Sequence, residues 1–166
     1  MNKLFIIPVL ICLVATTAFA QQEKRASPHD TVKGKNVEVT YGRPYKKGRD
    51  IFGGLVPYAE VWRTGADEAT QITFKKDGTF GGKPIKAGTY TLFTIPTQKE
   101  WVIILNSKLG QWGAFGYEKA KDKNVLQAIV QSGKTEQAVE QFTITAKDDA
   151  LLLEWDMTKV SVPMKF

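Results

Sequence analysis

The stretch "KAGTYTLFTIP", Lys86 to Pro96, is followed closely by "KEWVIILN", Lys99 to Asn106, and this pair decides the fold class. Both segments are rich in β-branched and aromatic residues, and the short connection between them is typical of a β-hairpin. Their apolar side chains alternate onto both faces, as in the second segment, where Trp101 and Ile103 oppose Val102. Because a sheet with one wet face needs apolar residues on one side only, we expect another segment to cover the outer face.

Extended segments continue through most of the chain. Alternation is clear in residues 36–42 and 69–75, and further strands are expected at 124–131, 139–146, 150–157 and 159–166. Asp77-Gly78 is a hairpin-turn signal, and one short helical turn is expected around Tyr117 to Asp122. Short strands at this spacing predict an all-β fold, either an antiparallel β-sandwich or a flattened barrel of about eight strands.

The connection between the first two of these segments, residues 42–67, is far longer than the roughly four to six residues of a typical loop. We call it the lid. It carries seven large apolar residues that would be costly to leave in water, namely Ile51, Phe52, Leu55, Val56, Tyr58, Val61 and Trp62. We therefore predict that the lid covers the outer face of the 86–106 hairpin as part of the core and does not move as a flap.

The first twenty residues are typical of a signal peptide. An apolar run too short for a stable membrane span ends in the small-x-small pattern Ala18-Phe19-Ala20. Removal of residues 1–20 also removes Cys12, the single cysteine, and leaves no disulfide or thiol nucleophile. We expect a periplasmic or secreted protein with a polar N-terminal arm (21–26), a single β domain (27–166) and no transmembrane segment.

Four blocks of the sequence carry a resemblance to a known family. They are "SPHDTV" (27–32), "VTYGRPYKKGRDIFGGLVPYAEVWRTGADEAT" (39–70), "AGTYTLFTIP" (87–96) and "GQWGAFGY" (110–117). Together they resemble the bacterial family catalogued as domain of unknown function 2911. The resemblance implies an exported protein with one β-rich domain, and it brings no catalytic residue because the family has no established activity.

The residue inventory excludes several classes of enzyme. The single histidine, His29, rules out a His-rich zinc site, and no serine hydrolase, zinc protease, Walker or calcium-loop motif occurs. We expect neither a metal nor another cofactor, and we expect His29 to be a structural residue at a turn or at the start of a strand. The net charge is +6, but predicted export and the lack of a basic helix argue against nucleic acid as a partner.

The end of the lid holds the candidate site. Arg63 lies close in sequence to Asp67 and Glu68, and a guanidinium can bind one carboxylate bidentately. Three charges this close cannot all be buried unpaired. We therefore expect Arg63 to bridge to Asp67 or Glu68, as a structural clamp or as part of a ligand site, with the other carboxylate left free.

Arginines and tryptophans complete the candidate site. Arg43 and Arg49 carry planar forks that suit carboxylate, phosphate or sulfate. Small residues near Trp62 and Trp112 leave a ring face within reach of a sugar, although the same pattern is typical of buried tryptophans beside tight turns.

These residues predict a protein that binds a small polar or anionic ligand, such as a sugar or an acid, at the lid and without catalysis. One alternative is a glycan-active enzyme that uses Asp67 and Glu68 with Arg63. Another is a structural domain that interacts with the cell envelope. A pocket lined by these three residues would favour the first two functions, and burial of all three as pairs would favour the third.

Overall fold

The computed structural model describes residues 24–166, so the predicted signal peptide and the first residues of the arm lie outside the described part. The strands are β1 (His29–Lys33), β2 (Val37–Gly42), β3 (Gln71–Phe74), β4 (Gly78–Phe80), β5 (Lys83–Ile85), β6 (Gly88–Pro96), β7 (Glu100–Asn106), β8 (Asn124–Ala146) and β9 (Ala150–Lys165). Two short 3-10 turns, η1 (Tyr117–Lys119) and η2 (Lys121–Lys123), precede β8. Within residues 24–166 no helix is both long and apolar enough to span a membrane.

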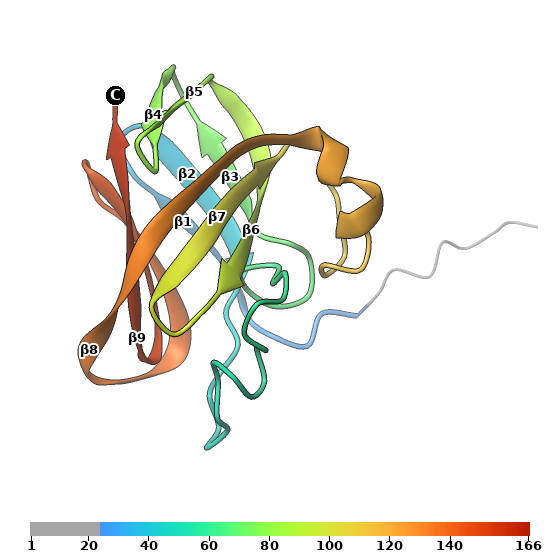
Figure 1. Cartoon of the computed structure of the whole chain (residues 1–166), viewed down its shortest axis with the longest axis vertical. Coiled ribbons are helices and arrows are strands. Elements are labelled where there is room, and N and C mark those ends of the chain that lie inside the picture. The colour runs from blue at the N-terminus through green and yellow to red at the C-terminus, as the bar shows by residue number, and fades with distance from the viewer. Residues whose placement is uncertain (1–23) are drawn as a thin grey trace, which may run out of the picture.

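The prediction of an all-β fold is confirmed. The nine strands form one antiparallel sheet in the order β1-β2-β3-β6-β7-β8-β9-β4-β5. The first part of β8 pairs with β7, and the part from Ser132 onward pairs with β9. β8 passes directly from its pairing with β7 into its pairing with β9, and the β8–β9 pairing contains two register shifts. The long, bent β8 curls the sheet around a single interior (Figure 1).

The interior is filled by alternate side chains of the strands. Strands β2 to β9 all contribute to one cluster of buried apolar residues, in which Val39, Ile72, Leu92, Ile103 and Leu153 are almost completely inaccessible to water. The matching residues on the other side of β6 and β7, Phe93 and Ile104, belong to a second cluster. The predicted hairpin therefore buries apolar side chains on both of its faces.

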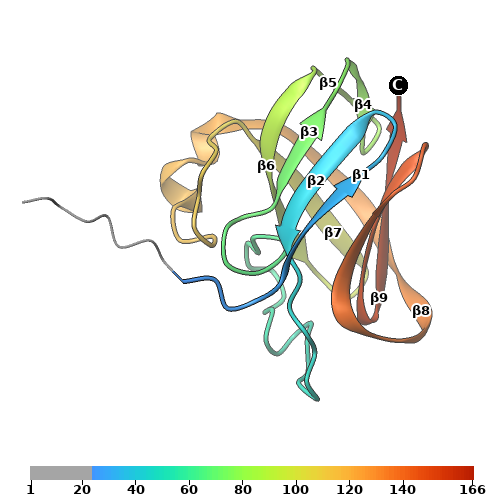
Figure 2. The same ribbon diagram turned by 180° about the vertical axis from the view of Figure 1, so that it is seen from behind.

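Contacts from the start of the lid and from β2 hold the curled sheet together without closing it into a barrel. The Phe142 N–H donates to the Pro44 carbonyl at 2.9 Å, and the Ile144 N–H donates to the Tyr41 hydroxyl at 2.9 Å. Both bonds join the β2 end of the sheet to the second half of β8. They fix the place at which the lid leaves the sheet, below the strands in Figures 1 and 2.

The lid is packed in part, as predicted: some of its apolar side chains enter the interior of the curled sheet, whereas Leu55 remains exposed. Ile51, Val56 and Trp62 are buried in the main core. Trp62 exchanges two backbone hydrogen bonds with Thr94 on β6, at 2.7 and 3.0 Å. Its indole stacks nearly parallel to that of Trp155 on β9, with ring centres 6.0 Å apart.

The expectation that the lid covers the outer face of β6 and β7 is wrong, because that face is covered mainly by the segment before β8. Tyr117 of η1 packs edge-on against Phe93, with ring centres 5.1 Å apart, and Ala114 lies in the same cluster. The lid itself contributes only Val61 there. Trp62 and Phe52 of the lid pack in the interior instead.

The prediction of a hairpin turn at Asp77-Gly78 is wrong. The strand after it, β4, does not pair with β3; it pairs with β5 and β9. The turn between β4 and β5 is Gly81-Gly82, whose φ angles are +59° and +76°. Two consecutive positive φ angles are what a tight two-residue hairpin turn requires, and glycine adopts them without a steric cost.

We predict that Trp62→Ala lowers the free energy of unfolding by about 3–5 kcal/mol, because it removes a large buried ring from a packed aromatic cluster. Urea denaturation measures the change. Phe115→Ala is the matched control: that ring is 85% exposed, and its removal should change stability by less than about 0.5 kcal/mol. Similar small effects for both substitutions would contradict a core role for the lid.

Candidate functional site

The four arginines of the chain divide into two kinds. Arg25 pairs with Glu68 at 2.7 Å, and Arg43 pairs with Asp30 at 3.1 Å. Within the described residues, Arg49 and Arg63 form no ion pair with a carboxylate. Both of these arginines line the same cavity, so the two guanidinium groups without a carboxylate partner in residues 24–166 are brought together.

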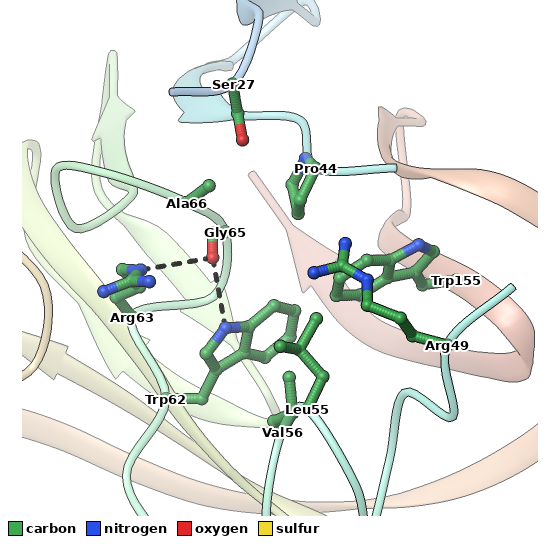
Figure 3. Close-up of a pocket in the computed structure, with 10 residues that line it drawn as sticks. All are labelled: Ser27, Pro44, Arg49, Leu55, Val56, Trp62, Arg63, Gly65, Ala66 and Trp155. Carbon is green, nitrogen blue, oxygen red and sulfur yellow. Dashed lines mark hydrogen bonds between the residues drawn. The ribbon is translucent and has the colours of Figure 1, made fainter. Parts of the chain in front are cut away.

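The cavity has a volume of about 220 Å³ and lies between the lid, the start of β1 and β9 (Figure 3). We call it the arginine cavity. Its polar groups come from Ser27, Arg49, Arg63 and Gly65, and its remaining walls are formed by Pro44, Leu55, Val56, Trp62, Ala66 and Trp155. No aspartate or glutamate lines it, so its electrostatic character is positive.

Backbone carbonyls hold the two arginines and leave other donors free of protein partners in the described structure. Arg49 donates from Nε to the Lys46 carbonyl at 2.9 Å and from Nη2 to the Tyr45 carbonyl. Arg63 donates from Nε to the Gly65 carbonyl at 3.4 Å. Because a guanidinium has five N–H donors, each arginine retains donors for an anion.

A glycine makes room for Arg63. Gly113 has a φ of +63°, and a Cβ atom at this position would lie 3.0 Å from Nη1 of Arg63. Any larger residue would press on the guanidinium as well as strain the backbone. The "GQWGAFGY" block therefore supports the site through Gly113.

Trp62 forms part of the cavity wall and is not an exposed platform. Its side chain lies in the aromatic cluster with Trp101 and Trp155, and only 8% of the residue is exposed. Its Nε1–H donates to the Gly65 carbonyl at 3.1 Å, the same oxygen that accepts from Arg63 (Figure 3). A ligand can contact part of this ring but cannot stack on a free indole face.

The prediction that Arg63 forms a salt bridge with Asp67 or Glu68 is wrong. Asp67 is buried and accepts hydrogen bonds from the backbone N–H groups of Ala26 and Ser27, each at 3.0 Å. Its Oδ2 also lies 3.3 Å from Nε2 of His29. The N-terminal arm thus takes the place that the sequence reasoning assigned to Arg63, because backbone donors and the imidazole satisfy the carboxylate without a guanidinium.

Glu68 also binds the N-terminal arm. It pairs with Arg25 and lies 3.4 Å from His29 Nε2. The hydrogen bond from Arg25 lowers the pKa of Glu68 below its usual value, and burial opposes this shift only partly. Burial alone would raise the pKa of Asp67, but the donors of Ala26, Ser27 and His29 together outweigh it and lower that pKa.

His29 therefore stands at the start of β1 in a structural setting, as expected. Its ring touches both carboxylates, but neither Asp67 nor Glu68 lines the arginine cavity. Residues 24–166 contain no group of three or more His, Cys, Asp or Glu side chains placed to hold a metal ion. The arrangement fastens the arm to the lid.

Arg43 and Trp112, the other two predicted site residues, lie outside the arginine cavity. Arg43 donates to the Phe142 carbonyl at 3.2 Å and to the Thr143 hydroxyl at 3.1 Å, besides pairing with Asp30. Trp112 is half-buried and forms a backbone bridge with Glu68. Arg43 joins β1 and β2 to β8, and Trp112 joins its loop to the end of the lid.

Backbone strain is concentrated around the arginine cavity. Five non-glycine residues within 24–166 have positive φ angles, and four of them, Lys47, Thr64, Asp67 and Asp156, stand within two positions of a cavity-lining residue. Such conformations cost of order 1–3 kcal/mol each and persist where the surrounding structure requires them, often at functional sites. The strain is a second observation, separate from charge, that marks this region.

Sequence reasoning missed Ser27, Pro44 and Trp155 as lining residues. They are distant from one another in the sequence, and only the curled sheet brings them together. Trp155 carries no local sign of its role, because its strand alternates like any outer strand. Pro44 and Ser27 do lie inside the blocks that carry the family resemblance.

We predict that Asp67→Asn lowers the free energy of unfolding by about 1–3 kcal/mol near neutral pH, because charge-assisted hydrogen bonds to the arm are lost. Asparagine tolerates the positive φ of this position, so the substitution isolates the charge. The folded-state pKa is lowered, so the contribution is present above the usual pKa of 3.8 and is lost as the pH falls below it. The stability difference from wild type should therefore shrink on acidification; urea titrations over pH measure it, and a pH-independent difference would contradict the assignment.

The comparisons with known proteins agree with the resemblance seen in the sequence. The family model described as "Protein of unknown function (DUF2911)" matches residues 23–164. No curated protein and no solved structure matches the chain. Since the match extends over nearly the whole curled sheet, the lid and the arginine cavity, the chain belongs to the DUF2911 family.

Proposed function

We propose that this protein binds a small anionic ligand in the arginine cavity. The observation that carries the proposal is that the two arginines without a carboxylate partner in residues 24–166, Arg49 and Arg63, line one cavity that contains no acidic residue. Guanidinium groups bind carboxylate, phosphate and sulfate through parallel N–H···O bonds. An anion there would neutralise charges that the described part of the chain leaves unpaired.

The other lining groups favour a ligand with an apolar part beside its anionic group. Pro44, Leu55 and Trp62 present carbon-rich walls, and the Ser27 side chain points toward the cavity centre in Figure 3. A sugar acid or another small organic acid combines an anionic group, hydroxyls and an apolar face. The anionic group would face the arginines, a hydroxyl would face Ser27, and the apolar face would lie against Pro44, Leu55 and Trp62.

The glycan-active alternative has less support. Asp67 and Glu68 are engaged by the arm and do not line the cavity, so neither is placed as a general acid or nucleophile for a ligand held there. The envelope-interaction alternative relied on an apolar outer patch over β6 and β7. That patch is covered by Tyr117 and its neighbours. We therefore propose binding without catalysis.

Residues 1–20 support an exported location, periplasmic or secreted, and we include it in the proposal. Expression in a Gram-negative host followed by osmotic-shock fractionation and intact-mass measurement tests it. The expected product begins at Gln21. Retention of residues 1–20 in a cytoplasmic product would contradict export.

We predict that Arg63→Gln weakens binding of galacturonate or phosphate by about tenfold, because one charge-assisted contact is lost. Isothermal titration calorimetry measures the affinity. Arg63 is a better test than Arg49, since the only hydrogen bond from its side chain to residues 24–166 is the long contact with Gly65, and the loss of this bond should hardly disturb the lid. Added sodium chloride should weaken the wild-type interaction by screening.

The control variant is Lys83→Gln, which removes an exposed positive charge on β5 that does not line the cavity. It should bind the same anions with wild-type affinity. Melting temperatures alone are not sufficient, because excluded anions such as sulfate and phosphate stabilise many proteins without a binding site. Equal affinities for wild type, Arg63→Gln and Arg49→Gln would overturn the proposal.

A further inference from the structure

A second hollow adjoins the arginine cavity. It has a volume of about 350 Å³ and shares Ser27, Pro44 and Arg49 with the cavity as common walls. Its other lining residues are Ala26, Pro28, Tyr45 and Lys47. We call it the lysine hollow. Arg49 stands at the boundary, so the two spaces form neighbouring compartments on the side of the molecule where the arm meets the lid.

The lysine hollow continues the positive charge of the cavity. No aspartate or glutamate lines it, and the ammonium group of Lys47 forms no ion pair within residues 24–166. The neighbouring carboxylate of Glu140 accepts a hydrogen bond from the backbone N–H of Lys47 at 2.8 Å. This bond, with one from the Lys46 N–H to the Glu140 carbonyl at 2.7 Å, ties the strained backbone of Lys47 to β8.

The position of Lys47 is therefore held by specific contacts, at a φ of +49° that most side chains avoid. Arg63, Arg49 and Lys47 follow one another from the far wall of the cavity, across the shared boundary, to the hollow. One anionic group can neutralise the charges at one end of this series. Lys47 is exposed at the other end, where its ammonium group is accessible to a second anionic group.

We infer that the ligand of this site is an elongated dianion, with one anionic group at Arg49 and Arg63 and the other at Lys47. This inference rests on the proposed function and adds the class of ligand. The arginine cavity alone is smaller than the roughly 300–1,000 Å³ of typical small-molecule pockets, whereas the two compartments together reach that range. The rings of Pro44, Pro28 and Tyr45 border the hollow and suit an apolar chain or a sugar ring between the two anionic groups.

Calorimetry with matched monoanions and dianions tests the inference. The probes are hexanoate against adipate and suberate, and galacturonate against digalacturonate, all at one ionic strength. Wild type should bind at least one dianion about tenfold more tightly than its monoanion, the effect of one added charge-assisted contact. Lys47→Gln should remove this preference and leave monoanion affinity within about twofold of wild type.

Two further variants make the result specific. Lys47→Asn should behave like Lys47→Gln and also tolerates the positive φ, so a folding defect in one variant does not decide the outcome. Lys83→Gln should keep the full dianion preference. If both Lys47 variants weaken monoanions and dianions equally, or if no dianion is preferred by wild type, the inference is overturned.

The failure of this inference differs from failure of the proposed function. Monoanion binding that depends on Arg63 but shows no dianion preference would leave the proposed function intact and remove only the dianion. Absence of any binding that depends on Arg49 or Arg63 would remove both.

Discussion

Trp62 packs against Trp155, Trp101, Phe52 and Phe142, and this aromatic cluster is the contact on which the rest of the lid depends. The cluster joins a loop residue to β7, to the second half of β8 and to β9, so it fixes the lid against both arms of the curled sheet. The positions of Arg49 and Arg63 follow from it, because both belong to the chain that Trp62 anchors. The aromatic core therefore supports the charged cavity. Burial of apolar area in this core stabilises the lid, and the lid carries the two arginines that have no carboxylate partner.

Much of the fold could be predicted because its signals are local. Alternating segments such as 36–42 and the dense hairpin of 86–106 predict strands by side-chain period alone, and the large apolar residues of the lid predict packing. The predictions that failed were those that depended on pairing between strands distant in the sequence. Asp77-Gly78 has the composition of a turn, yet β3 pairs with β2 and β6 while β4 pairs with β9, which no local pattern specifies. The inner position of the lid likewise depends on how far the sheet curls along β8.

The candidate site was predicted in part for the same reason. Trp62, Arg49 and Arg63 lie near one another in the sequence and line one cavity, so the sequence did predict that these three residues lie together. The partner of Asp67 and Glu68 could not be inferred, because it is the arm, some forty residues earlier in the chain. Charge proximity in sequence favoured Arg63, but the backbone N–H groups of Ala26 and Ser27 bind Asp67, and the Arg25 side chain binds Glu68. The missed lysine hollow follows from this error, since the docked arm forms one of its walls.

A sheet that curls without closing keeps two free edges, β1 and β5, and such edges are templates on which other chains can polymerise. The β5 edge is only three residues long and contains Pro84 between Lys83 and Ile85, and proline offers no N–H to an incoming strand. The β1 edge carries Asp30 and Lys33, which add charge against a stacked neighbour. These edges therefore disfavour edge-to-edge aggregation, a hazard for a strand-rich protein that lacks disulfides in its described part. The sheet can therefore stay open at one end, where the lid and the cavity lie, while its free edges disfavour the strand addition that leads to fibrils.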